Sequence, residues 1–164
     1  DTTEPVGFLA HAVRSDTIDH AYMLWMARSY RPGTDERLYL KMDGHKLYEY
    51  ALKTVPGVVL KCLEKAGLTV RDVHKVLIHQ ANAKMDEAIL KRVFKLAGLG
   101  EAPLEVMPMT ISWLGNSSVA TLPTLLDLLL KGRLDGHAMP KGAVIVFASV
   151  GAGMNINAAA YRMP

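Results

Sequence analysis

Two hydrophobic patterns alternate along this chain, and together they predict a layered α/β domain. Short apolar runs, typical of strands, cover residues 7–14, 75–79, 105–110 and 143–149, and a last strand follows over 155–162. The Gly-Ala-Gly sequence at 151–153 is expected to form the turn before that last strand, which would then run antiparallel to its neighbour. The order of elements is βαβαβαββ, which predicts a five-stranded mixed sheet covered by helices.

Helical periodicity marks three longer segments. Apolar residues recur every three or four positions over 43–66, 83–97 and about 118–131. We expect Asn82 to cap the second of these helices, and Thr69 with Asp72 to cap a short turn before it. Pro56, followed by a glycine, is expected to kink or split the first helix, because proline removes a backbone donor. Residues 22–42 fit neither pattern, so an irregular loop rich in aromatic residues is predicted there.

The composition is that of a globular domain. Half of the 164 residues are hydrophobic (50%), enough for a substantial core, and the longest apolar runs are too short to span a bilayer. No signal-peptide pattern is found at the start, and the one cysteine, Cys62, can neither form an internal disulfide nor build a cysteine-rich metal site. Because Cys62 lies on an apolar helical face, a buried hydrophobe is expected rather than a nucleophile. A cytoplasmic protein without a membrane or metal partner is predicted.

The net charge of +3 comes from basic residues that are scattered among acidic ones. There is no tract of five or six like charges and no nucleic-acid-binding motif, so a nucleic-acid partner is not expected. An acidic protein or a phosphorylated ligand fits this modest excess better.

Polar residues follow the apolar runs at three places, where strands of α/β folds deliver side chains to a site. His79 ends a buried strand, and a neutral imidazole there can donate to a developing oxyanion. Ordinary explanations also exist: a core histidine bonded to the backbone, a helix cap at Ser117 or Ser118, and a tight hairpin turn. No other histidine pairs with His79 at a metal-binding spacing. The three segments are residues 78–82 (Ile-His-Gln-Ala-Asn), 115–118 (Gly-Asn-Ser-Ser) and 151–153.

In order and spacing, these segments resemble the C-terminal half of β-ketoacyl-acyl carrier protein synthase III, a branch of the thiolase superfamily. The similarity runs across most of residues 5–162 and includes the Lys-Met-Asp-Gly sequence at 41–44. It implies that residues 1–164 form one thiolase-like half of a condensing enzyme of fatty acid synthesis. The motifs that carry it are His79-Gln80-Ala81-Asn82, Gly115-Asn116-Ser117-Ser118-Val119-Ala120 and Gly151-Ala152-Gly153.

The resemblance also implies roles for individual residues. His79 and Asn116 would bind the thioester carbonyl of malonyl-acyl carrier protein, so that decarboxylation gives an enolate. The turn at Ala152 and Gly153 would help to form the oxyanion hole for the acyl-enzyme. No cofactor is implied.

Three lysines of the second helix belong to the same interpretation. Lys84 stands where the family commonly carries a basic residue near the carrier-protein entrance, and Lys91 and Lys95 share a helix face with it. This face would suit an acidic helix of acyl carrier protein. Ordinary solvation explains the three charges nearly as well.

The nucleophilic cysteine of the family lies in its N-terminal half, and nothing in this chain matches its surroundings. The chain alone is therefore expected to be inactive. With an N-terminal half it would form a full-length homodimer that uses an acyl-coenzyme A or acyl-carrier protein donor. The apolar surface that such a half covers would be exposed here, so self-association is expected.

Two departures from the family pattern keep alternatives open. Ala152 replaces a glycine in a turn that is often all glycine, which requires a negative φ at that residue. The stretch 154–157 lacks the usual tryptophan, and the aromatic segment 22–30 is unlike the housekeeping enzymes. The alternatives are a ketosynthase of secondary metabolism, a relative that joins two long acyl chains without decarboxylation, and a noncatalytic carrier-protein-binding subunit of a two-chain synthase.

Overall fold

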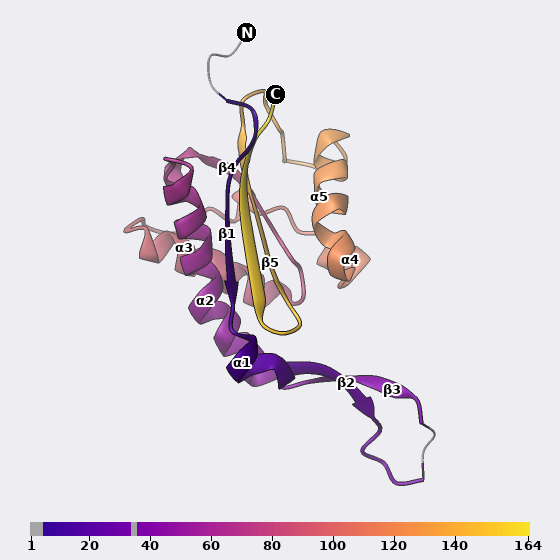
Figure 1. Ribbon diagram of the computed structural model, residues 1–164. Helices are drawn as coiled ribbons and strands as arrows, with labels where there is room; N and C mark the ends of the chain where they lie inside the picture. Colours follow the sequence, from indigo (N-terminus) through magenta and orange to yellow (C-terminus); the bar gives the residue numbers. More distant parts are fainter. Residues whose placement is uncertain (1–4, 34–35) are drawn as a thin grey trace.

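A four-stranded mixed sheet forms the centre of the molecule (Figure 1). The computed structural model describes residues 5–33 and 36–164. The strands lie in the order β1 (Gly7–Ser15), β6 (Asn155–Arg162), β5 (Val144–Gly151) and β4 (Val73–Ile78). The pairs β1–β6 and β6–β5 are antiparallel, and β5–β4 is parallel. The α/β class and the antiparallel final strand are confirmed.

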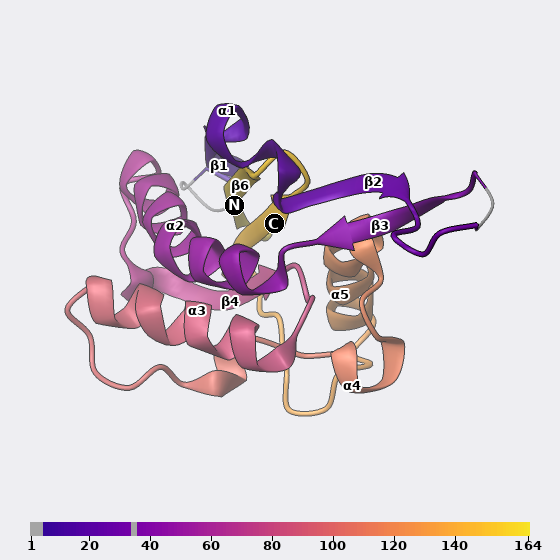
Figure 2. The same cartoon turned by 90° about the horizontal axis from the view of Figure 1, so that it is seen from below.

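Helices cover both faces of this sheet (Figures 1 and 2). The long helices α2 (Gly44–Lys65) and α3 (Ala83–Leu96) share one core with one face of the sheet, whereas α5 (Thr121–Leu130) packs on the opposite face. The shorter elements are α1 (Thr17–His20), η1 (Ala21–Met23), η2 (Val70–Asp72), η3 (Leu104–Val106), α4 (Ile111–Leu114) and η4 (Ser118–Ala120).

The expected fifth strand is wrong, because residues 105–110 form no ladder with a neighbour. Pro103 and Pro108 lack the N–H group that a ladder requires. Side chains instead hold the segment near β4, where the Lys75 Nζ donates to the Glu105 carbonyl at 2.9 Å. The segment therefore keeps a place beside β4 without belonging to the sheet.

The irregular loop predicted for residues 22–42 is also wrong. Its described part contains β2 (Leu24–Arg28) and β3 (Leu38–Met42), which pair antiparallel and project away from the rest of the molecule (Figure 2). Both strands keep large apolar side chains in solvent, so they lack the alternation between a buried and an exposed face that normally predicts a strand.

Local expectations for the helices are mostly confirmed. The Asn82 side chain accepts hydrogen bonds from the first amides of α3, and Thr69 and Asp72 form the expected capping box. Cys62 is fully buried on α2. The predicted split at Pro56 is wrong, since α2 runs as one helix through this residue, which is itself buried in the packed face. No helix in the described residues is long and apolar enough to cross a membrane.

Candidate active site

His79 is delivered by the C-terminal end of β4. Within β4, Val76 and Ile78 pack into the core beneath α2 and α3, whereas Leu77 packs with α5. Side chains alternate along a strand, so His79, two residues after Leu77, lies on the α5 side. Its backbone N–H donates to the Ala148 carbonyl at 2.9 Å and thereby continues the pairing of β4 with β5. The backbone of His79 is thus fixed to β5 at the C-terminal end of the edge strand β4.

The environment of His79 favours a neutral ring. The side chain is half-buried, and this burial lowers the pKa of His79 below its usual value, while the Ser118 backbone partly opposes the shift. At neutral pH the ring therefore carries one N–H donor and one acceptor nitrogen.

Asn116 follows the short helix α4 and a glycine with φ 66°, which turns the chain out of the helix. The Asn116 Oδ1 accepts a hydrogen bond from the Ser118 N–H at 2.9 Å. This bond fixes the orientation of the carboxamide, whose Nδ2 group is the end that can donate to a ligand. The Ser118 backbone, which binds the Asn116 side chain, also acts on the pKa of the His79 ring, so this residue lies next to both predicted donors.

The third predicted segment is the hairpin turn between β5 and β6. The Thr17 Oγ1 donates to the Gly153 carbonyl at 2.6 Å, and the Asn155 Nδ2 donates to the Ala152 carbonyl at 3.0 Å. Gly153 has φ 74°. Ala152 is not among the described residues with positive φ, which agrees with the requirement that a non-glycine residue in this turn keep a negative φ. Since β4 and β5 are parallel, the turn lies beyond the same end of the sheet as His79. It is three residues further along β5 than Ala148, roughly 10 Å.

The predicted docking lysines are exposed on α3. Lys84 is in the first turn, close in sequence to His79, and Lys95 is in the last turn. Eleven helical residues separate them, about 16 Å along the helix axis. The three lysines, with Lys91 between the other two, thus form a stripe along one face of α3.

Two buried polar residues that follow His79 closely in sequence were not predicted to have a role. Gln80 belongs to the motif at 79–82, and it is fully buried and bonded to residues 108–111. Asp86 of α3 is also fully buried, and neither carboxylate oxygen has a hydrogen-bond partner among the described residues. Burial raises the pKa of Asp86 to about 7. Its place in a first helical turn gave no signal, since acidic residues are common there.

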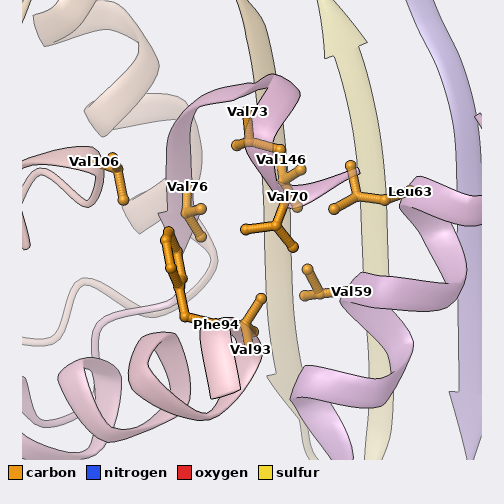
Figure 3. A pocket seen from close by; sticks show the side chains of 9 residues that line it. All are labelled: Val59, Leu63, Val70, Val73, Val76, Val93, Phe94, Val106 and Val146. Carbon is orange, nitrogen blue, oxygen red and sulfur yellow. The ribbon is translucent and has the colours of Figure 1, made fainter. Parts of the chain in front are cut away.

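A cavity on the other face of the sheet is not part of this arrangement (Figure 3). Side chains of α2, α3 and the sheet line it, and all are apolar, so it offers no group for acid–base or oxyanion chemistry. Its lining consists of Val59, Leu63, Val70, Val73, Val76, Val93, Phe94, Val106 and Val146.

Among known proteins, a family model described as 3-oxoacyl-[acyl-carrier-protein (ACP)] synthase III C terminal matches residues 63–163. The β-ketoacyl-[acyl-carrier-protein] synthase III of Thermosynechococcus vestitus is 33% identical over 123 residues, which are 75% of this chain and 34% of that protein. Its counterpart in Oenococcus oeni is 27% identical over 139 residues, 85% of this chain and 40% of that protein.

Two solved structures extend this likeness to the fold. The synthase III of Thermus thermophilus has a TM-score of 0.77 at 27% identity, covering 100% of this chain and 48% of that one. A priming β-ketosynthase from the R1128 polyketide biosynthetic pathway has a TM-score of 0.78 at 25% identity, covering 99% and 46%. The chain thus spans less than half the length of these relatives. It belongs to the family of 3-oxoacyl-acyl carrier protein synthase III C-terminal domains, within the thiolase superfamily.

Proposed function

We propose that this chain is the half of a β-ketoacyl synthase III that activates malonyl-acyl carrier protein. The complete enzyme condenses an acyl thioester with the malonyl group, with loss of carbon dioxide, in fatty acid synthesis. The observation that carries the proposal is the position of His79 at the end of β4, next to Ser118, whose N–H binds the Asn116 side chain.

The chemistry follows from where negative charge develops. When the malonyl group loses carbon dioxide, electrons move onto the thioester oxygen and form an enolate. The imidazole N–H of His79 and the Nδ2 group of Asn116 donate to that oxygen, in a half-buried setting where such bonds are stronger than in water. Because they act on charge present mainly in the transition state, these donors accelerate the chemical step rather than binding alone.

Replacing either donor tests this role in the intact protein. We expect His79→Ala to lower malonyl decarboxylation on the order of 10²–10³-fold, while acyl transfer to the cysteine of the N-terminal half stays measurable. Asn116→Asp should cause a similar loss, because the carboxylate still accepts from the Ser118 N–H but cannot donate. His74→Ala, an exposed histidine of the same strand, is the control. Equal loss of both reactions in His79→Ala would contradict the assignment.

The remaining parts of the enzyme complete the proposal. An N-terminal half supplies the nucleophilic cysteine, the full-length protein is a cytoplasmic homodimer, and the donor is an acyl-coenzyme A or an acyl-carrier protein. The 151–153 turn, through Ala152 and Gly153, contributes to the oxyanion hole of the acyl-enzyme. The isolated chain is inactive, since Cys62 is buried in α2 and burial raises the pKa of its thiol.

Carrier-protein docking on α3 is tested by charge reversal. Lys84→Glu with Lys91→Glu should weaken binding of malonyl-acyl carrier protein on the order of tenfold, and the loss should shrink at high salt. The matched control is Lys53→Glu with Lys61→Glu, which changes the net charge equally on exposed positions of α2. Equal weakening by both pairs would show that net charge, rather than the stripe on α3, governs binding.

A second candidate is a ketosynthase of secondary metabolism. The likeness to the priming β-ketosynthase of a polyketide pathway favours it, as does the missing tryptophan after the 151–153 turn. A rate profile of the intact enzyme over short, long and branched acyl donors separates the two candidates.

A further inference from the structure

We propose that Gln80 is the positioning residue that sets Asn116 against His79. The inference rests on the function proposed for those two donors and adds a third residue, which never touches substrate. Its basis is a buried carboxamide that fastens the segment carrying Asn116 to the end of β4.

Gln80 uses both ends of its side chain. The Nε2 group donates to the Pro108 carbonyl at 2.9 Å. The Oε1 atom accepts from the Thr110 N–H at 2.8 Å and the Ile111 N–H at 3.0 Å, and lies 3.2 Å from the Thr110 hydroxyl. The side chain is fully buried, so water does not compete for these bonds.

These bonds replace two structural features that the segment lacks. Residues 105–110 form no ladder with β4, and Thr110 makes no side-chain cap for the helix that follows it. The Oε1 of Gln80 instead satisfies the free amides at the start of α4. Gln80 therefore caps the helix and, together with Lys75, attaches the segment to β4.

The connection to catalysis is short. The chain runs from Ile111 through α4 and one glycine to Asn116, and two residues later Ser118 lies next to the His79 ring, whose pKa its backbone affects. Gln80 holds the start of this segment, and its end lies beside His79. Because the two residues are neighbours in sequence, a shift at Gln80 moves Asn116 relative to His79, and a misplacement of about 1 Å can cost on the order of 10²-fold in rate.

Two substitutions in the intact protein test the proposal. Gln80→Met has a similar size and makes none of these bonds, so kcat for malonyl decarboxylation should fall on the order of 10²-fold, with little change in KM for malonyl-acyl carrier protein. Gln80→Glu keeps the acceptor and regains the donor when its acid is protonated. Its rate relative to the unmodified protein should therefore recover as the pH falls.

A substrate-free readout separates this inference from the proposed function. A crystal structure of the Gln80→Met protein should show Asn116 displaced relative to His79, whatever reaction the enzyme catalyses. An unmoved Asn116 would overturn the inference. If His79→Ala and Asn116→Asp keep full decarboxylation activity, the proposed function is contradicted instead.

General destabilisation is controlled by Val59→Ala, a core change on α2 that removes none of the hydrogen bonds between Gln80 and residues 108–111. It should lower the melting temperature without a selective loss of kcat. If Val59→Ala lowers kcat as much as Gln80→Met at a matched loss of thermal stability, the positioning role is wrong.

Discussion

Asp86 is an acidic residue in a fully buried position, which is unfavourable for its charged form. Its carboxyl group is fully enclosed and both oxygens lack partners among the described residues. Burial penalises the charged form and raises the pKa of Asp86 to about 7. The folded protein thus holds this group as a neutral acid at low pH, whereas the unfolded chain releases the proton at a pKa of about 3.9.

This difference predicts a pH dependence of stability. Between about pH 4 and 7 the folded state binds one more proton than the unfolded state, so the free energy of unfolding falls as the pH rises, by up to roughly 1.4 kcal/mol per pH unit. Above pH 7 the folded state no longer keeps the extra proton on Asp86, so the stability gained from holding this acid neutral is lost. Asp86→Asn should remove this slope and be the more stable protein at pH 8. Urea unfolding at pH 5, 6, 7 and 8 checks the prediction, and parallel curves for the two proteins would contradict it.

The pKa of His79 is lowered, whereas the pKa of an ordinary ion-paired histidine is raised. Since burial lowers the pKa of His79, the neutral ring stabilises the fold above the unfolded value near 6.5, and this stabilisation is lost as the pH falls below it. An NMR titration should place the pKa of this ring below 6.5. Donation to a thioester oxygen requires the proton on the nitrogen that faces away from Ser118, and the ¹⁵N shifts of the ring in the complex with malonyl-acyl carrier protein should show it there. A proton on the other nitrogen would contradict that role.

Among the elements, the β5–β6 hairpin depends on one glycine. Gly153 has φ 74°, and a Cβ atom added there would lie 2.9 Å from the Asn155 Nδ2 and 3.4 Å from the Thr17 Oγ1. We expect Gly153→Ala to lower the free energy of unfolding by about 1–3 kcal/mol. Gly151→Ala is the control, because its Cβ would meet nothing within 4 Å and its φ is not positive. Chemical denaturation compares the two, and equal losses would show that strain at residue 153 is not the cause.

Elements with one face buried in the core were predicted correctly from the sequence. Segments that lack a buried face, or that side-chain hydrogen bonds position, were not. β4, β5, β6 and the long helices keep their hydrophobic period because burial imposes it. The β2–β3 hairpin has no buried face in this chain, and residues 105–110 are positioned by side chains. In the candidate site, His79 and Asn116 were predicted through their motif. Gln80 was missed because its partners, residues 108–111, are distant in sequence and become neighbours only in the fold.

For the molecule as a whole, the β2–β3 hairpin presents a large apolar surface. Met26 pairs with Leu40 across the two strands, and their side chains are 56% and 67% exposed. Leu38 and Met42 lie on the same face of β3 and are exposed as well. Such a surface is costly in water and favours association.

We therefore expect the isolated chain to self-associate. Sedimentation at increasing concentration should show a rising average mass, and Leu38→Lys with Leu40→Lys should lower that mass without changing the melting temperature of the core. A single monomeric species at all concentrations would contradict the prediction.

The position of β1 also affects how the chain folds. β1 comes first among the strands, yet its neighbour in the sheet is β6, the last, with Gly7 opposite Arg162. During synthesis β1 emerges long before β6 and has no partner until nearly the whole chain is available. Contacts of such large sequence separation slow folding and leave an unpaired strand open to aggregation. Ribosome-bound nascent chains that stop before residue 155 should therefore require chaperone protection of residues 7–15.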